Sequence, residues 1–337
     1  MPPPDDRLIG AERILQLSRG YWASQALFVA VRLGLFALLE RGPQGIPGLA
    51  RLLGTDPEAT RRLANALVGL GLLSRKEEGY ENSLLARELL VPGKENYLGH
   101  AIHHDENLWP YWEKLDQAIR MGSPVAFKVM EKGPYDYGHR LEDYLLAMRD
   151  HASLLAPQIV RAFDLTGCRR LLDLGGGPGV YAQAFARHHP ELRVTLYDLD
   201  AVIELAERWI EPGLLGNRVH TCRGNFLEGD WPPADAIFFS QVIHIYDAPI
   251  VRQLIEKAHD TLAPEGRIAI HDYLLQADGS VPSAGSLFAL NMLLGTPKGA
   301  CYPAVELAGW LSEAGFEEIR ELPISPSTSL ILGKKGR

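Results

Sequence analysis

One stretch, Leu171 to Gly179 (LLDLGGGPG), constrains the fold of this chain more than any other. It is typical of a short buried strand that runs into a glycine turn, and the residues after it (VYAQAFA) have a helical pattern. A turn of glycines lets the backbone approach a ligand closely, and the helix that follows offers unpaired N–H groups. The stretch therefore predicts a nucleotide-type binding turn, although a plain tight turn can have the same pattern.

The residues around the turn indicate which ligand it suits. In the dinucleotide fingerprint G-x-G-x-x-G, a pyrophosphate sits on the helix N-terminus. Here the spacing is D-x-G-G-G-x-G, with Asp173 two residues before Gly175. A carboxylate beside the turn disfavours phosphate and suits cationic or hydroxyl groups. S-adenosylmethionine carries a sulfonium and an amino group and no phosphate, so the turn favours this cofactor.

From Arg169 onward the chain alternates strands and helices, which is the signature of a parallel α/β sheet. Only Pro323 to Ser327 separate the last two strands, and so short a link forbids a parallel crossover. We therefore expect five parallel strands, a late helix at about Tyr302–Ala314 and an antiparallel final strand, the layout of class I methyltransferases. The expected strands are Leu171–Leu174, Val194–Tyr197, Val219–Thr221, Ala236–Phe239, Arg267–His271, Glu318–Leu322 and Thr328–Leu332.

The N-terminal third is mainly helical. After two helical patterns in residues 8–40, a helix, a turn at Gly54, a second helix and a hairpin predict a winged helix. Thr55 is the expected N-cap of the second helix. Residues 91–160 are expected to be helices with many aromatic residues, most of which serve core packing. We divide the chain into a winged-helix dimerisation domain (1–95), a helical connector and substrate lid (96–160) and a cofactor-binding catalytic domain (161–337).

Charge and composition limit the partners of the chain. Its 337 residues are 46% hydrophobic with a net charge of −8, which is typical of a globular protein without a polyanion partner. Residues 43–90 hold six Arg or Lys and six Asp or Glu, so this module offers little counterion-release energy to DNA.

Arg32 interrupts the apolar run Tyr21 to Leu39, which favours a buried helix over a membrane span. Three cysteines and no signal-peptide pattern predict a cytoplasmic location.

Polar residues follow the predicted strands where a ligand would bind. Asp198 ends the second strand, about twenty residues past the turn, where a carboxylate accepts from ribose hydroxyls; capping of the next helix is the alternative. Asn225 and Phe226 follow the third strand and offer an amide and an aromatic face to adenine. His244 lies just beyond the fourth strand and Asp272 just beyond the fifth, so Asp272 could hold the imidazole in one tautomer. A lone structural histidine remains the alternative.

Together the motifs LLDLGGGPG, YDLD, GNF, SQVIHIYD, GRIAIHD and LFALNMLL…VELAGWLSEAGF resemble the plant-type, acetylserotonin-like O-methyltransferases, which include bacterial natural-product enzymes. The resemblance covers nearly the whole chain. It implies a homodimer formed through the N-terminal domain, and a small, aromatic substrate methylated at a hydroxyl, with His244 as general base. For the cofactor, S-adenosylmethionine, it implies the contacts Gly175, Gly177, Asp198, Asn225, Phe226 and Ser240; for the substrate pocket it implies Trp109, Trp112, Phe127, Met148, Phe288, Asn291 and Met292.

The sequence departs from that family at three places. Asn225 stands where an Asp is usual, Ile245-Tyr246 replace Asp-Trp after His244, and Cys301 falls where a second carboxylate often flanks the histidine. These departures leave open methylation at nitrogen or carbon, in which His244 only binds substrate, and a scaffold that binds cofactor without transfer. A metal bound by His244 is a weaker alternative, since Ile245 offers no second donor, and we expect no metal. The remaining alternative is a regulator that senses a ligand and binds DNA through the winged helix.

Overall fold

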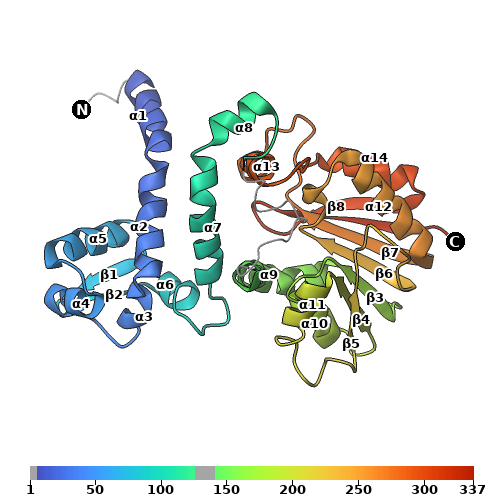
Figure 1. Ribbon diagram of the computed structural model, residues 1–337, viewed down its shortest axis with the longest axis horizontal. Helices are drawn as coiled ribbons and strands as arrows, with labels where there is room; N and C mark the ends of the chain where they lie inside the picture. The colour runs from blue at the N-terminus through green and yellow to red at the C-terminus, as the bar shows by residue number, and fades with distance from the viewer. Residues whose placement is uncertain (1–5, 126–140) are drawn as a thin grey trace. The chain divides into compact units, whose positions relative to one another are not determined.

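The computed structural model of the chain describes residues 6–125 and 141–337 (Figure 1). These residues belong to two compact units, Met1–Asn107 and Leu108–Arg337. Each unit has its own core. The finer three-part division at residues 95 and 160 stays a prediction.

The first unit contains a bundle of helices and one small hairpin. Helix α4, the Gly54 turn, helix α5 and the hairpin follow one another in the order that the sequence predicted. The elements are α1 (Asp6–Ser18), α2 (Gly20–Arg32), α3 (Leu35–Leu39), α4 (Ile46–Leu53), α5 (Pro57–Gly69), the antiparallel strands β1 (Leu73–Lys76) and β2 (Gly79–Asn82), α6 (Leu84–Leu89) and α7 (Gly99–Trp112), whose last turn belongs to the second unit.

The apolar run between Tyr21 and Leu39 forms two helices and not one. Gly34 takes a left-handed conformation (φ 70°) between α2 and α3, which a residue with a side chain adopts only at a cost. Phe36 and Leu39 of α3 are then buried in the core of this unit. None of the helices in the described residues has the length and apolarity that a membrane crossing requires.

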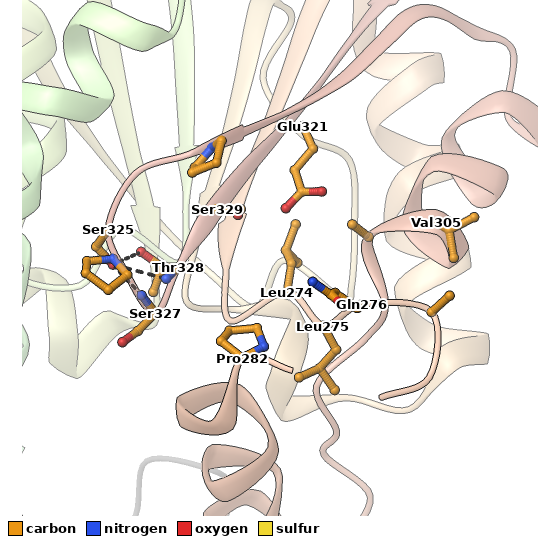
Figure 2. A pocket seen from close by; sticks show the side chains of 14 residues that line it. Leu274, Leu275, Gln276, Pro282, Val305, Glu321, Ser325, Ser327, Thr328 and Ser329 are labelled. Atoms are coloured by element: carbon orange, nitrogen blue, oxygen red, sulfur yellow. Dashed lines mark hydrogen bonds between the residues drawn. The ribbon is translucent and has the colours of Figure 1, made fainter. Parts of the chain in front are cut away.

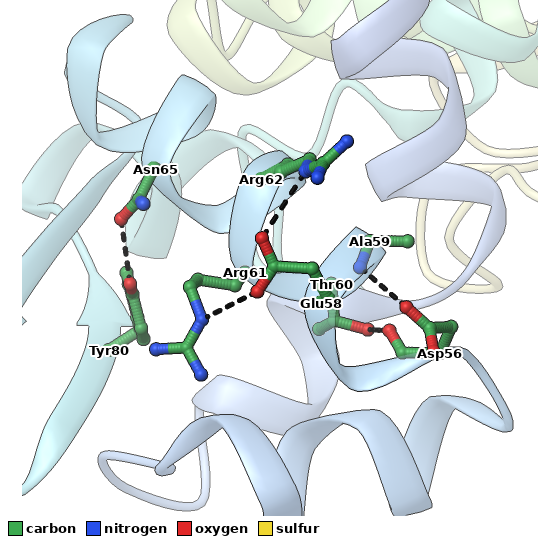
Figure 3. A network of polar contacts seen from close by, with 8 residues as sticks. All are labelled: Asp56, Glu58, Ala59, Thr60, Arg61, Arg62, Asn65 and Tyr80. Carbon is green, nitrogen blue, oxygen red and sulfur yellow. Dashed lines mark hydrogen bonds and ion pairs between the residues drawn. The ribbon is translucent and has the colours of Figure 1, made fainter.

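The start of α5 differs from the prediction. Asp56, and not Thr55, is the N-cap: its carboxylate accepts from the backbone N–H of Ala59 at 2.8 Å (Figure 3). The hydroxyl of Thr55 lies 2.7 Å from that of Thr60 instead. Both residues are good caps, and Pro57 fits the first turn of the helix that Asp56 begins.

The second unit is built on a seven-stranded sheet in the order β5-β4-β3-β6-β7-β9-β8. All seven predicted strands are present: β3 (Arg170–Leu174), β4 (Arg193–Asp198), β5 (Val219–Arg223), β6 (Ala234–Ser240), β7 (Leu262–Asp272), β8 (Phe316–Pro323) and β9 (Ser329–Lys335). Strand β9 runs antiparallel to both of its neighbours, as the short link before it required, and the other pairings are parallel. This is the class I methyltransferase layout that the sequence predicted.

Helices cover both faces of this sheet, which is why its strands are apolar on both sides (Figure 1). Neighbouring residues of β6 show the alternation: Phe238 packs among α9 and α10, and Phe239 packs in the opposite cluster with α12. The helices of this unit are α8 (Leu115–Met121), α9 (Leu141–Ala162), α10 (Val180–His188), α11 (Asp200–Ala206), α12 (Ala248–Thr261), α13 (Ser283–Gly295) and α14 (Ala304–Glu313).

Candidate active site

The glycine turn lies between β3 and α10, as predicted. Gly175 and Gly177 both have left-handed backbones (φ 67° and 53°). A Cβ at Gly175 would lie 2.8 Å from Cγ2 of Val242, whereas a Cβ at Gly177 would meet only Leu145 Cδ2, at 3.9 Å. The first glycine is therefore required by packing within the protein. The second leaves bare backbone that a ligand can approach.

Asp198 holds the turn from the end of β4. One carboxylate oxygen accepts from the backbone N–H of Gly177 at 2.9 Å, and the other accepts from that of Leu199 at 2.7 Å. Burial raises the pKa of Asp198 to about 6, and these two hydrogen bonds oppose the rise. The carboxylate thus lies against the turn, where the sequence predicted a ribose acceptor, and it is only 3% exposed.

Asp173 lies beneath the same turn and is fully buried. A Cβ at Gly176 would be 2.6 Å from its carboxylate, and neither of its oxygens makes a hydrogen bond within the described residues. Burial, and after it the charge of Asp198, raise the pKa of Asp173 to about 8. A carboxyl group with that pKa is mostly protonated at neutral pH, so Asp198 supplies the negative charge beside this turn, which suits a cationic ligand and disfavours phosphate.

The residues after β5 border the turn on another side. The ring of Phe226 is 5% exposed and lies 3.4 Å from the position of a Cβ at Gly175. It also meets Tyr246 edge to face at 6.0 Å. Asn225 is used locally: its side-chain oxygen accepts from the N–H of Leu227 and its nitrogen donates to Glu228, both at 3.1 Å. Phe226 is therefore placed at the turn, while the amide of Asn225 orders its own loop.

The structure brings His244 and Asp272 together in a buried pair. His244 lies on a short 3₁₀ helix (Ile243–Ile245) after β6, and Asp272 is the last residue of β7. Nδ1 of the imidazole is 2.7 Å from Oδ1 of the carboxylate, and both side chains are less than one tenth exposed. Because a carboxylate only accepts, Nδ1 carries the hydrogen and Nε2 keeps its lone pair. Parallel neighbouring strands end at one edge, which is why these two residues meet.

The remaining surroundings of this pair are aromatic and apolar. Phe288 of α13 meets the His244 ring edge to face at 4.9 Å and stacks on Tyr273 with ring centroids 4.1 Å apart. Cys301 is buried, and burial, followed by the charge of Asp272, raises the pKa of its thiol to about 12. Cys301 is thus a neutral group, so it does not supply a second carboxylate. Oδ2 of Asp272 is buried without a hydrogen bond in the described residues.

Of residues 296–302 the sequence indicated only Cys301, yet this segment fixes the backbone around His244. The N–H of Ala300 donates to the carbonyl of His244 at 2.9 Å, and the Tyr302 hydroxyl donates to that of Tyr246 at 2.6 Å. A Cβ at Gly299 would lie 2.5 Å from the His244 carbonyl. The glycine in this segment was the one signal in the sequence that a close backbone approach occurs there.

Ser240 lies at the carboxyl end of β6 next to the turn, and it is held by residues that the sequence did not identify. Its hydroxyl is 2.9 Å from Nδ1 of His271, and Nε2 of His271 is 2.9 Å from the hydroxyl of Thr328. The ring of Tyr181 of α10 meets that of His271 edge to face, with centroids 6.4 Å apart. His271 is fully buried, and burial lowers its pKa to about 4. It is therefore neutral at physiological pH.

Thr328 also lines a cavity of about 400 Å³ between the segment after β7 and the β8–β9 turn (Figure 2). Ser325 of that turn lies 2.9 Å from Thr328, and Leu274 and Glu321 line the cavity with them. None of the predicted cofactor or substrate residues lines it. Thr328 is therefore both part of the cavity wall and the anchor of His271.

The predicted substrate residues are brought together only in part. Besides Phe288 at the histidine, Trp112 donates from its indole to the side chain of Asn291 at 3.1 Å. Trp109 instead donates to Glu113, the residue that follows its own helix, at 2.9 Å. Met292 of α13 is 8% exposed, Met148 of α9 is partly buried, and Phe127 lies outside the described residues. Within the described residues, no three His, Cys, Asp or Glu side chains converge as metal ligands do.

Comparisons with known proteins agree with this geometry. Residues 112–317 match the model of the O-methyltransferase domain, and residues 15–92 match that of the O-methyltransferase dimerisation domain. The chain is 32% identical to 3-hydroxy-5-methyl-1-naphthoate 3-O-methyltransferase of Streptomyces sahachiroi, over 91% of this chain and 90% of that protein. It is 31% identical to the tetracenomycin polyketide synthesis 8-O-methyl transferase TcmO of Streptomyces glaucescens, over 99% of both.

The fold matches solved structures equally well. Human N-acetylserotonin methyltransferase in complex with S-adenosylmethionine superposes with a TM-score of 0.90 at 25% identity, over the full length of both chains. The glycine turn, the acidic end of β4 and the ring of Phe226 fit that cofactor in this chain, because they combine bare backbone, acceptors without basic partners and an aromatic face. The chain belongs to the plant-type family of S-adenosylmethionine-dependent O-methyltransferases that act on small metabolites.

Proposed function

We propose that this enzyme methylates a hydroxyl group of a small aromatic metabolite, with His244 as the general base. The observation that carries the proposal is the buried contact of 2.7 Å between His244 Nδ1 and Asp272 Oδ1. An imidazole whose Nδ1 is held by a carboxylate keeps Nε2 available as a proton acceptor, and its protonated form is stabilised by the same carboxylate. Both properties are those of a base that removes a hydroxyl proton.

The cofactor would be held by the residues around the glycine turn. The backbone at Gly177 and the carboxylate of Asp198 suit its amino-acid and ribose parts, and Phe226 suits the adenine plane. The positive charge of a bound cofactor would favour the ionised form of Asp173. Ser240 borders the turn from β6. When bound, S-adenosylmethionine supplies a methyl group on a positively charged sulfur that is already reactive toward nucleophiles.

The protein's own part of the reaction is alignment and proton removal. Alignment of the acceptor oxygen with the methyl group converts an encounter into an in-line displacement. A phenol with a pKa of about 10 is mostly protonated at neutral pH, so a base in contact with it increases the rate by about 10²–10⁴-fold. Asp272 orients His244, and the packing of Phe288 against the imidazole keeps water from that side.

An aromatic acceptor is favoured by the rings beside the base. The stacked pair Phe288–Tyr273 lies against the imidazole of His244, and Trp112 is fixed by Asn291 on α13. Rings of this kind bind planar acceptors by stacking and edge contacts. One of the relatives is named for a hydroxynaphthoate and another for tetracenomycin, which supports a fused-ring phenol as the first acceptor to try.

The enzyme is proposed to act as a homodimer. Helices α1 and α2 expose large apolar side chains, among them Leu8 (66%), Ile14 (65%), Leu17 (73%) and Trp22 (57%), in a region that matches the dimerisation domain from residue 15 onward. A second copy covering this face would remove the exposed apolar area from water. Sedimentation velocity should give twice the chain mass, and Trp22→Glu should shift the protein toward monomer. A monomeric wild type at micromolar concentration would contradict the proposal.

DNA binding through the first unit is less well supported. Arg61 and Arg62, the basic residues of α5, both pair with Glu58, at 3.1 and 3.3 Å (Figure 3). Tyr80 of β2 donates to Asn65 of the same helix, so this polar surface is engaged within the unit. Two arginines that share one carboxylate offer little free positive charge to a phosphate backbone.

The decisive experiment compares turnover with cofactor binding in His244→Ala. On hydroxynaphthoates we expect turnover to fall by about 10²–10⁴-fold, because only the base is lost. Calorimetric binding of S-adenosylhomocysteine should stay within about threefold of wild type. Product mass spectra should locate the methyl group on oxygen, and aminonaphthalenes serve as the matched nitrogen acceptors. Wild-type turnover by His244→Ala, or methyl transfer to the amines alone, would refute the base assignment.

A further inference from the structure

Strand β7 ends in two neighbouring polar residues that point to opposite faces of the sheet. Asp272 contacts His244, whereas His271 faces the other way, among the residues that pack with α9 and α10. Ser240 pairs with His271 across the β6–β7 ladder and extends toward the same face. The end of β7 therefore contributes Asp272 to the proposed base, His244, and His271 to Ser240.

His271 is fully buried and satisfied on both of its nitrogens. Nδ1 lies 2.9 Å from the hydroxyl of Ser240, and Nε2 lies 2.9 Å from that of Thr328. Thr328 is itself fixed by Ser325, 2.9 Å away, at the β8–β9 turn. The imidazole is thus held at both ends, by Ser240 at the end of β6 and by Thr328 at the β8–β9 turn.

A serine hydroxyl by itself is a poor fixed contact, because its hydrogen rotates and its oxygen changes rotamer easily. Ser240 has a restraint in the imidazole of His271, whose Nδ1 lies 2.9 Å from the hydroxyl. Ser240 is only partly buried. The bond to His271 uses part of its hydrogen-bonding capacity and leaves the rest for a ligand.

We propose that His271 is a positioning residue that holds the hydroxyl of Ser240 for contact with S-adenosylmethionine. This inference rests on the proposed role of Ser240 at the cofactor, and it does not depend on His244 being the base. His271 itself does not touch the cofactor. It removes the rotational freedom of the hydroxyl before binding, so the entropy of ordering that group is not lost when the cofactor binds.

The matched test uses two amide side chains at one position. In His271→Asn the amide replaces Nδ1, which keeps the bond to Ser240 and loses the anchor at Thr328. In His271→Gln the amide replaces Nε2, which keeps the anchor and loses the bond to Ser240. Both variants bury a similar amide in the same place, so a purely structural role for His271 affects them alike.

The readout is the Kd of S-adenosylhomocysteine from calorimetry, together with KM for S-adenosylmethionine and kcat. We expect Kd to rise about two- to threefold in His271→Asn and in Thr328→Val, and about tenfold in His271→Gln and in Ser240→Ala. KM for the cofactor should rise with Kd, and kcat at saturation should stay within about twofold. In the Ser240→Ala background, His271→Gln should weaken binding no further.

Every other result contradicts either the positioning role of His271 or the cofactor contact of Ser240. Equal weakening by His271→Asn and His271→Gln, or wild-type binding by His271→Gln, overturns the positioning role while leaving Ser240 as a cofactor contact. Wild-type binding by Ser240→Ala overturns both. If thermal melts show that His271→Gln does not fold, the cycle of Ser240→Ala with Thr328→Val decides, because additive effects there also overturn the role.

Discussion

Two buried histidines stand near the ends of neighbouring strands in this enzyme, and they differ in what lies beside them. His244 is 6% exposed and contacts the carboxylate of Asp272. His271 is fully buried and contacts only the hydroxyls of Ser240 and Thr328 through its two nitrogens. A carboxylate stabilises an imidazolium, whereas hydroxyls leave burial unopposed, and burial favours the neutral ring.

The difference separates two tasks that the same side chain can perform. An imidazole that must accept a proton needs a partner that stabilises the resulting charge. An imidazole that must stay fixed needs two satisfied nitrogens and no charge. Because sequence neighbours on a strand face opposite sides, His271 and Asp272 serve these two tasks from adjacent positions.

Among the changes that test this difference between His244 and His271, removal of the Asp272 carboxylate should have the largest effect on activity. Asp272→Asn would offer an amide to Nδ1 of His244, so the imidazole could take the wrong tautomer and its cation would lose stabilisation. We expect kcat to fall by about 10³-fold, with the Kd of S-adenosylhomocysteine within about threefold of wild type. Single-turnover rates at saturating cofactor measure this directly.

The matched control for that variant is His271→Asn, one residue away on the same strand. It also places an amide at the end of β7, but on the other face, and its kcat should stay within about twofold of wild type. Similar losses of kcat in the two variants would mean that any change at the end of β7 disturbs the active site through the structure. Asp272 and His271 would then not have separate tasks.

Acidification should affect the stability of the enzyme through His271. Its pKa is about 4 in the folded protein and has an ordinary value of 6.5, so the folded state binds fewer protons than the unfolded chain between these values. The unfolding free energy that the neutral His271 contributes is therefore present in full above about pH 6.5. It is lost as the pH falls to about 4. The loss amounts to about 3 kcal/mol of unfolding free energy.

Urea unfolding of wild type and His271→Asn between pH 7 and pH 4 checks the sign. The carboxylates common to both proteins cancel in the difference, which isolates the imidazole. Wild type should lose more stability than the variant on acidification, by about 3 kcal/mol. Parallel profiles for the two proteins would show that His271 is not the neutral, buried group described above.

The sheet could be predicted from the sequence because its signals are local. Seven short apolar runs, separated by helical patterns, correspond to β3–β9, and the five residues between the last two strands required the antiparallel β9. The glycine turn and the His244–Asp272 contact followed from the rule that parallel strands end together. The N-cap of α5 was assigned one residue early, because Thr55 and Asp56 are neighbours and both residue types occur as N-caps.

Contacts between distant parts of the chain could not be predicted. Nothing local to Ser240 indicates that His271 holds it, or that Thr328 in turn holds His271, because the two bonds join residues 31 and 57 positions apart. The hydrogen bond from Ala300, in residues 296–302, to the carbonyl of His244 also joins distant parts of the chain. The cavity beside Thr328 also had no signal in the sequence.

The sequence alone determined the order of strands and helices, the glycine turn and the acid at the end of the second strand, because hydrophobic period, glycine and strand ends are local properties. The tertiary structure alone decided the role of the polar side chains whose partners lie elsewhere in the chain. It placed Asp173 beneath the turn, gave His271 two hydroxyl partners, and left Cys301 neutral. Burial and partners set the charge of a side chain, and both depend on residues far away in the sequence.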